Sequence, residues 1–221
     1  SILGHNSLLR NAILNDKVGN IIFSGPPGVG KTTLIEIISS NTRSSLIKLN
    51  AVLSSIKELR TEIANAKERL RSSNRKTILF IDEVHRFTSV QQDALLPSIE
   101  NGTITFIGAT TENPFFAVNK ALISRARIFS LLPLNKNDLK KIIDKVIKYY
   151  SCLKDSKVIE IKEEAINHLI KFSGGDARNL INALELGISI TKENKENLVV
   201  IDLSIAEDSI QKKNIVYDKN G

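Results

Sequence analysis

The spacing of apolar residues divides the chain into a part that alternates strands with helices and a part rich in helices. Up to about residue 132, short apolar runs alternate with segments whose apolar residues recur every three or four positions. The short runs favour strands buried on both faces, and the three-to-four spacing favours amphipathic helices. The expected strands cover 21–24, 45–49, 77–81, 103–109 and, more weakly, 128–131. This alternation predicts the α/β fold class, with a parallel sheet covered by helices.

Helices are expected between these strands. They cover 31–40, 55–70 and 90–100. The second opens with Ser55 and carries Glu58 three residues later, a capping-box pattern that satisfies backbone N–H groups of the first turn. The third contains Pro97, which should kink it or end it early, because proline has no N–H to donate and its ring crowds the preceding turn.

After Pro133 the pattern changes to helices only. An apolar stripe over 139–150 indicates one helix, a second is expected over 163–172, and Asp176 caps a third. The last stretch is charged and rich in asparagine, apart from an apolar island at 198–201. We interpret that island as a short strand or a packed turn.

The length of the chain and this change of pattern favour two domains. A chain of 221 residues can bury one large core or two modest ones. We expect an α/β domain over 1–132 and a small helical domain over 133–221. The chain neither begins with nor contains methionine, so we interpret it as a fragment of a longer protein.

Composition narrows the class of protein further. The net charge is +7 and the isoelectric point is near 9.4, which permits contact with nucleic acid. The single cysteine, Cys152, leaves neither a disulfide framework nor a structural zinc cluster. No apolar run approaches the length of a membrane span, and no signal-peptide pattern opens the chain. We therefore expect a cytoplasmic protein with no membrane partner.

The most informative motif lies between the first expected strand and the first expected helix. It fits the pattern of a glycine, four residues and Gly-Lys-Thr that binds nucleotide phosphates. Glycines let the backbone wrap round phosphate oxygens, so that N–H groups and the positive end of the helix face the anion. Lys31 would reach the β- and γ-phosphates of ATP, and Thr32 would offer its hydroxyl to Mg²⁺. The expected nucleotide-binding residues are Gly25, Pro26, Pro27, Gly28, Val29, Gly30, Lys31, Thr32 and Thr33.

A second motif supplies groups for hydrolysis. Asp82 follows four apolar residues, so it stands at the carboxyl end of a buried strand, where open α/β sheets bind ligands. There its carboxylate can hold Mg²⁺, usually through water. Glu83 is then placed to polarise the water that attacks the γ-phosphate. The alternative reading of Glu83 is a surface glutamate at the start of a helix, where acidic residues are favoured.

These motifs and the small helical domain together resemble the AAA+ ATPases, and most closely the RarA (MgsA) family of replication-associated recombination ATPases. The resemblance is carried by Ile81–Phe87, Gln91–Pro97, Gly102–Pro114, Leu122–Arg127 and Gly174–Arg178. It implies a P-loop NTPase parallel sheet followed by an all-α AAA+ lid domain. It also implies upstream residues that complete the adenine pocket and a C-terminal tetramer-forming region, and we expect both to lie outside this sequence.

The resemblance assigns roles to further residues. Thr111 corresponds to sensor 1, which hydrogen-bonds the γ-phosphate or the attacking water, with Thr110 as the fallback. Asn50 corresponds to the residue that holds the catalytic glutamate inactive until DNA binds, although an asparagine there is also a routine turn former. Arg178 corresponds to sensor 2, which contacts the γ-phosphate from the lid. An ordinary turn threonine and a surface arginine are the plainer readings of Thr111 and Arg178.

Arg125 corresponds to the arginine finger, which acts on the ATP of the neighbouring subunit. Such a finger stabilises the charge that develops on the transferred phosphoryl group. The monomer should then hydrolyse ATP poorly, and a homo-oligomer is implied, a tetramer in the full-length protein. Arg127 is a second candidate, and a salt-bridged surface arginine is the plainer reading of Arg125.

The same resemblance implies a nucleoid-associated protein that acts on DNA forks, gaps or ends, with single-strand binding protein among its partners. The protein would contact DNA through basic side chains on the phosphate backbone, and this binding would weaken as the salt concentration rises. For Lys57, Arg60 and Lys67, a solvated helix face is the better reading. Two alternatives stay open: a clamp-loader subunit or RuvB-like branch-migration motor, and a nucleotide-gated interaction module with little turnover.

Overall fold

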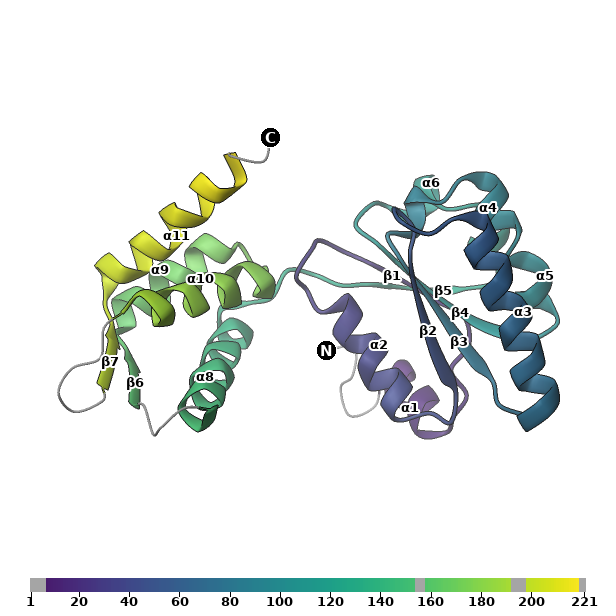
Figure 1. Ribbon diagram of the computed structural model, residues 1–221, viewed down its shortest axis with the longest axis horizontal. Coiled ribbons are helices and arrows are strands. Elements are labelled where there is room, and N and C mark those ends of the chain that lie inside the picture. The colour runs from purple at the N-terminus through teal and green to yellow at the C-terminus, as the bar shows by residue number, and fades with distance from the viewer. Residues whose placement is uncertain (1–6, 154–157, 192–197, 219–221) are drawn as a thin grey trace. The chain divides into compact units, whose positions relative to one another are not determined.

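The computed structural model of the chain describes residues 7–153, 158–191 and 198–218 (Figure 1). They form two compact units. The first contains residues 1–26 and 30–132, and the second contains residues 27–29 and 133–221. In the described residues, no helix is long and apolar enough to cross a membrane.

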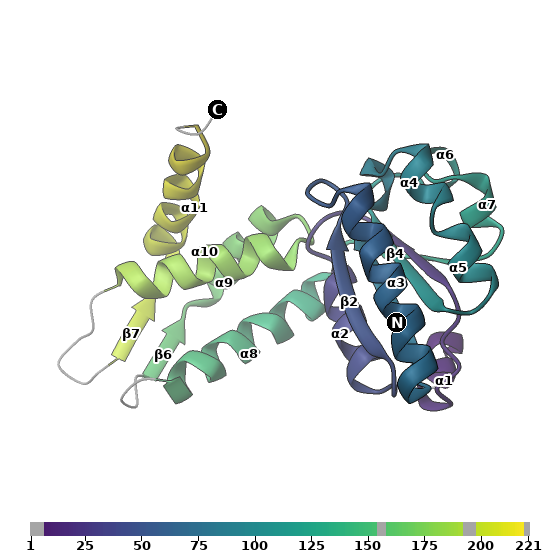
Figure 2. The same ribbon diagram turned by 45° about the vertical axis from the view of Figure 1, so that its right-hand side comes forward.

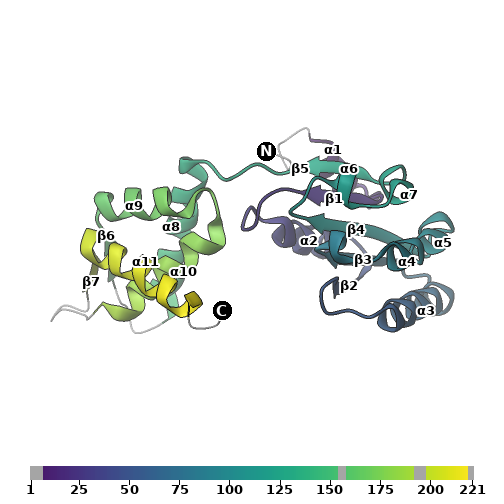
Figure 3. The ribbon, with the colours of Figure 1, turned by 90° about the horizontal axis from the view of Figure 1, so that it is seen from above.

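The first unit is built on a five-stranded sheet in which all neighbouring strands are parallel. Its strands are β1 (Ile21–Ser24), β2 (Ser45–Asn50), β3 (Thr77–Asp82), β4 (Ile104–Thr110) and β5 (Arg127–Ser130). They lie in the order β2-β3-β4-β1-β5 (Figure 3). All five predicted strands are therefore confirmed, within one residue at each end. The order places the carboxyl ends of β3, β4 and β1 side by side.

The two faces of the sheet pack into separate clusters because successive side chains of a strand point to opposite sides. On one face, residues such as Phe23 and Phe80 pack against α1 (Leu8–Leu14) and α2 (Lys31–Ser40). On the other, residues such as Ile22 and Leu79 pack against α3 (Ile56–Ser73) and the short helices that follow β3. Both faces are buried, which explains the unbroken apolar runs of the central strands.

The helix predicted over 90–100 is two short helices. They are α4 (Ser89–Asp93) and α5 (Leu96–Glu100), preceded by the 3-10 turn η1 (Val84–Arg86). Pro97 lies in the first turn of α5, where a missing N–H costs no intrahelical hydrogen bond. The proline therefore separates the two helices and starts the second. The remaining helices of this unit are α6 (Pro114–Ala117) and α7 (Lys120–Ile123).

The second unit is mainly helical, as predicted, with α8 (Lys136–Leu153), α9 (Glu163–Ser173), α10 (Ala177–Ile190) and α11 (Leu203–Asp218). The expectation of helices only is wrong in one respect. The apolar island is the strand β7 (Leu198–Ile201), and it pairs in parallel with the unpredicted β6 (Val158–Ile161) (Figure 2). Strand β6 has only four residues, and only Ile159 among them is buried, so its apolar signal is weak.

Candidate nucleotide-binding and hydrolysis site

The loop between β1 and α2 has a backbone that requires glycine at two of its positions. Gly30 caps α2 with φ near 93°, in the left-handed region that side chains avoid. Gly25 has φ near 148°, and a Cβ there would lie 2.4 Å from the carbonyl oxygen of Leu131. The loop thus brings bare backbone N–H groups to the amino end of a ten-residue helix. That is the arrangement expected for a phosphate-binding loop.

Lys31 is buried at the start of α2, with 7% of the residue exposed. Its Nζ donates hydrogen bonds to the carbonyl oxygens of Gly25 and Pro26, at 2.6 and 2.8 Å. The ammonium group of Lys31 is therefore held over the phosphate-binding loop, which directly precedes Lys31 in the sequence. Thr32 and Thr33, by contrast, are exposed on the first turn of α2.

Asp82 ends β3, and Glu83 begins the turn that follows. Glu83 adopts a left-handed backbone, with φ near 52°. A residue other than glycine held in this region stores strain, and such positions cluster at functional sites. The backbone N–H of Glu83 donates to Oδ1 of Asp82 at 3.1 Å, and within the described residues this is the one hydrogen bond recorded for the Asp82 carboxylate.

The carboxylate of Glu83 contacts two side chains. The hydroxyl of Thr111 donates to its Oε2 at 3.2 Å, and Nδ1 of His85 lies 3.3 Å from the same oxygen. The structure thus brings Glu83 together with the predicted sensor Thr111. His85 is a contact that the sequence reasoning missed, and its position two residues after Glu83 was the one available signal.

Two other predicted residues lie on the same edge of the sheet. Asn50 ends β2 and stands opposite Asp82 in the strand register. Its Oδ1 accepts a hydrogen bond from the backbone N–H of Val52 at 2.8 Å. Thr110, the fallback sensor, is fully buried at the end of β4, and its hydroxyl lies 2.9 Å from Nδ1 of His85.

Arg125 lies at the opposite edge of the sheet. It stands two residues before β5, whose first residue, Arg127, pairs with Ile21 at the start of β1. Because β1 has four residues, this edge is roughly 13 Å from the phosphate-binding loop. The guanidinium of Arg125 donates to Oε1 of Glu100 at 2.6 Å and to the carbonyl oxygen of Ala121 at 2.9 Å.

Arg178 belongs to the second unit. It is the second residue of α10, and its side chain is exposed. Its backbone N–H and that of Asn179 donate to Oδ1 of Asp176, at 2.7 and 3.0 Å. The predicted cap Asp176 therefore does start this helix.

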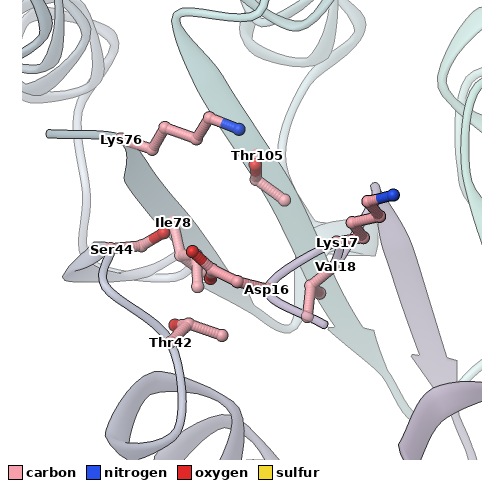
Figure 4. A pocket seen from close by; sticks show the side chains of 9 residues that line it. Asp16, Lys17, Val18, Thr42, Ser44, Lys76, Ile78 and Thr105 are labelled. Atoms are coloured by element: carbon pink, nitrogen blue, oxygen red, sulfur yellow. The ribbon is translucent and has the colours of Figure 1, made fainter. Parts of the chain in front are cut away.

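A small cavity of about 200 Å³ lies at the amino edge of the sheet, away from Lys31, Asp82 and Glu83 at the carboxyl edge (Figure 4). It is bordered by the segments before β1, β2 and β3 and by the start of β4. Lys17 and Lys76 are exposed and stand at its margin. Asp16 and several hydroxyl-bearing residues also line it. None of the predicted site residues lines this cavity.

The carboxyl edge fits a Mg²⁺–nucleotide complex. Thr32 and Asp82 offer hydroxyl and carboxylate oxygens, which are the ligands that Mg²⁺ prefers. Among the described residues, no group of three or more His, Cys, Asp or Glu could hold a metal ion alone.

Two family descriptions match this chain. Residues 21–134 match the "ATPase family associated with various cellular activities (AAA)", and residues 154–221 match the "AAA C-terminal domain". The first match contains the phosphate-binding loop, Asp82, Glu83, Thr111 and Arg125.

Curated relatives cover the chain from end to end. It is 40% identical over 220 residues to replication-associated recombination protein A of Haemophilus influenzae and 36% identical over 220 residues to that of Escherichia coli K12. It is also 37% identical over 236 residues to ATPase WRNIP1 of Dictyostelium discoideum, of which it covers 27%. The chain spans about half the length of the two bacterial relatives, 49% of each. The resemblance predicted from the sequence is confirmed.

Solved structures share the fold. RuvB of Thermotoga maritima, described as a Holliday junction branch migration motor, matches with a TM-score of 0.70 at 24% identity. That match covers 92% of this chain and 65% of the RuvB chain. At this identity the likeness concerns the fold, and the predicted P-loop fold class is confirmed.

Proposed function

Because the chain belongs to the ATPase family associated with various cellular activities (AAA), we propose that it is a Mg²⁺-dependent ATPase that acts on DNA in replication-fork maintenance or recombination. One observation carries the proposal. The carboxyl ends of three adjacent strands, β3, β4 and β1, gather the Glu83–Thr111 pair, Asp82 and the loop that holds Lys31. Those are the groups that hydrolysis of a nucleoside triphosphate needs.

Each residue has a distinct role in this proposal. Backbone N–H groups of Gly28–Thr32 cradle the phosphates, and Lys31 exchanges the loop's carbonyl oxygens for phosphate oxygens. Bound Mg²⁺, held by Thr32 and Asp82, would neutralise charge that develops on the phosphates. Glu83 accepts a proton from the attacking water, and Thr111 fixes the direction of its carboxylate.

The place of Arg125 supports hydrolysis at subunit interfaces. It lies at the amino edge of the sheet, so it cannot serve the loop of its own subunit. A second copy that presents this edge to the loop would bring the guanidinium to the γ-phosphate, where such a finger contributes about 10³–10⁵ in rate. Arg178 would act from the second unit of the subunit that binds the nucleotide.

DNA as the partner is proposed from the relatives. Replication-associated recombination protein A and WRNIP1 are full-length proteins of which this chain covers a half or less. The net charge of +7 is the feature of this chain that agrees with phosphate contact. A cytoplasmic location is likewise proposed from the similarity to the bacterial relatives.

The first test is ATP turnover per subunit across a range of protein concentrations, with and without forked DNA. Glu83→Gln should lower turnover by about 10²–10⁴ while ATP binding is retained, because only proton transfer is lost. Exposed Glu36→Gln is the matched control and should leave turnover unchanged. Tight ATP binding with equally negligible turnover in both variants would favour the nucleotide-gated module instead.

Mixing experiments test the assembly. Arg125→Ala and Lys31→Ala should each be inactive alone, because one lacks the finger and the other the phosphate contact. A mixture should recover part of the activity, since an intact loop can then face an intact Arg125. No recovery at any ratio would exclude a finger supplied by the neighbouring subunit.

A further inference from the structure

The imidazole of His85 lies between two carboxylates that come from different elements. Its Nδ1 is 3.3 Å from Oε2 of Glu83, in the turn after β3. Its Nε2 is 3.4 Å from Oε1 of Glu112, beyond the end of β4. Only 5% of the His85 side chain is exposed, so its neighbours rather than solvent fix the ring.

The ring is also fixed by the end of β4. Nδ1 of His85 lies 2.9 Å from the hydroxyl oxygen of Thr110, which is fully buried. The same hydroxyl oxygen accepts the backbone N–H of Glu112 at 3.0 Å. With a proton on Nδ1, the imidazole can donate to the carboxylate of Glu83 or to the hydroxyl oxygen of Thr110, which both lie within reach of that nitrogen.

Glu83 is therefore joined to one short segment at two points. Thr111 reaches its Oε2 directly, and His85 links the same oxygen to Thr110 and Glu112. The three consecutive residues 110–112 thus determine where the carboxylate points. The backbone conformation of Glu83 limits its rotamers, and these contacts select among the staggered positions that remain.

We propose that His85 is a positioning residue that holds the carboxylate of Glu83 on the segment Thr110–Glu112. The inference rests on the proposed function, because it takes Glu83 as the base. A general base acts only within hydrogen-bond reach of the proton it accepts, and a displacement of about 1 Å can cost about 10²-fold in rate. Glu112 is more than half exposed, so it is the end of this contact chain that a docking partner can reach.

The amide variants of His85 separate its two contacts. In His85→Asn the amide nitrogen replaces Nδ1 and keeps the contact to Glu83, whereas in His85→Gln it lies nearer the place of Nε2. We expect His85→Gln to lower kcat by about 10- to 100-fold with KM for ATP unchanged. His85→Asn should retain kcat within about three-fold, since the contact to the base survives. Thermal unfolding and ATP binding are measured on both variants to establish that each folds.

A spectroscopic readout without nucleotide tests the contact itself. The chain has three histidines, so the ring ¹⁵N resonances of His85 are assigned by their loss in His85→Asn. Glu83→Gln and Glu112→Gln should each shift these resonances, whereas Glu36→Gln should not. Glu112 is exposed, so its variant remains informative if His85→Gln fails to fold.

The outcomes distinguish this inference from the proposed function. If the His85 resonances have the same chemical shifts in wild type and in both glutamate variants, the inference is overturned, regardless of the rate of ATP turnover. Normal kcat in His85→Gln, alongside loss of turnover in Glu83→Gln, would also overturn it and would leave the proposed function intact. If the glutamate variants shift the His85 resonances but the wild-type chain shows no turnover, the contact is supported and the proposed function is contradicted.

Discussion

At the scale of single residues, the ion pair of Arg125 bears directly on its proposed role. Its guanidinium is held on its own subunit by Glu100 and by the carbonyl oxygen of Ala121. An arginine that enters a neighbouring site must leave these partners. The side chains are 38% and 52% exposed, and exposed pairs contribute about 0.2–1 kcal/mol. If Arg125 is the finger that we propose, Glu100 sets a small barrier to its insertion.

Glu100→Gln should therefore raise ATP turnover in the assembling protein by between about 1.4-fold and 5-fold, the range that this ion-pair energy allows. The measurement is turnover at a protein concentration below full assembly. Glu36→Gln, which removes another exposed ion pair, is the control. A fall in turnover would show that Glu100 instead orients Arg125 for insertion.

At the scale of elements, Gln92 joins three segments that are separate in the sequence pattern. It lies in α4 and is 5% exposed. Its amide nitrogen donates to the carbonyl oxygen of Phe87 at 3.0 Å, and its amide oxygen accepts the backbone N–H of Asn119 at 2.7 Å. The side chain thus fixes α4 to the turn before it and to the start of α7.

Gln92→Leu should lower the free energy of unfolding by about 2–6 kcal/mol, because the buried carbonyl of Phe87 and the partly buried N–H of Asn119 lose their partners at about 1–3 kcal/mol each. Chemical denaturation monitored by circular dichroism measures the loss. Val90→Ala, at an exposed position of the same helix, should change stability by no more than about 0.5 kcal/mol. Equal stability of wild type and Gln92→Leu would contradict this account of the contact.

At the scale of the whole molecule, the two units have separate hydrophobic cores. Leu79 belongs to a cluster of the first unit, and Leu180 to that of the second. Each is essentially inaccessible to solvent. Each unit therefore has its own source of stability.

Leu79→Ala and Leu180→Ala should each lower the free energy of unfolding of one unit by about 2–5 kcal/mol and leave the other in place. Differential scanning calorimetry should then resolve two transitions, of which each variant shifts one. If both variants shift a single transition equally, the cores are coupled and this prediction fails.

Much of the fold was predictable because its determinants are local. The central strands of the first unit appear as apolar runs, because a strand buried on both faces needs apolar side chains on each of them. The break between α4 and α5 was anticipated at Pro97, although its form was not. Strand β6 was missed because it depends on β7, about forty residues away in the sequence, and a four-residue run carries little periodicity.

The sequence by itself determined the phosphate-binding loop and the acidic strand end. Glycines with positive φ, a lysine at the start of a helix and a carboxylate after a buried strand are properties of consecutive residues. Only the tertiary structure decided which groups meet. Thr111 reaches Glu83 because the parallel strands β3 and β4 end side by side. Glu100, at the end of α5, pairs with Arg125, just after α7, because these short helices pack beside the sheet. Contacts of that kind depend on the packing of whole elements, and no local pattern encodes them.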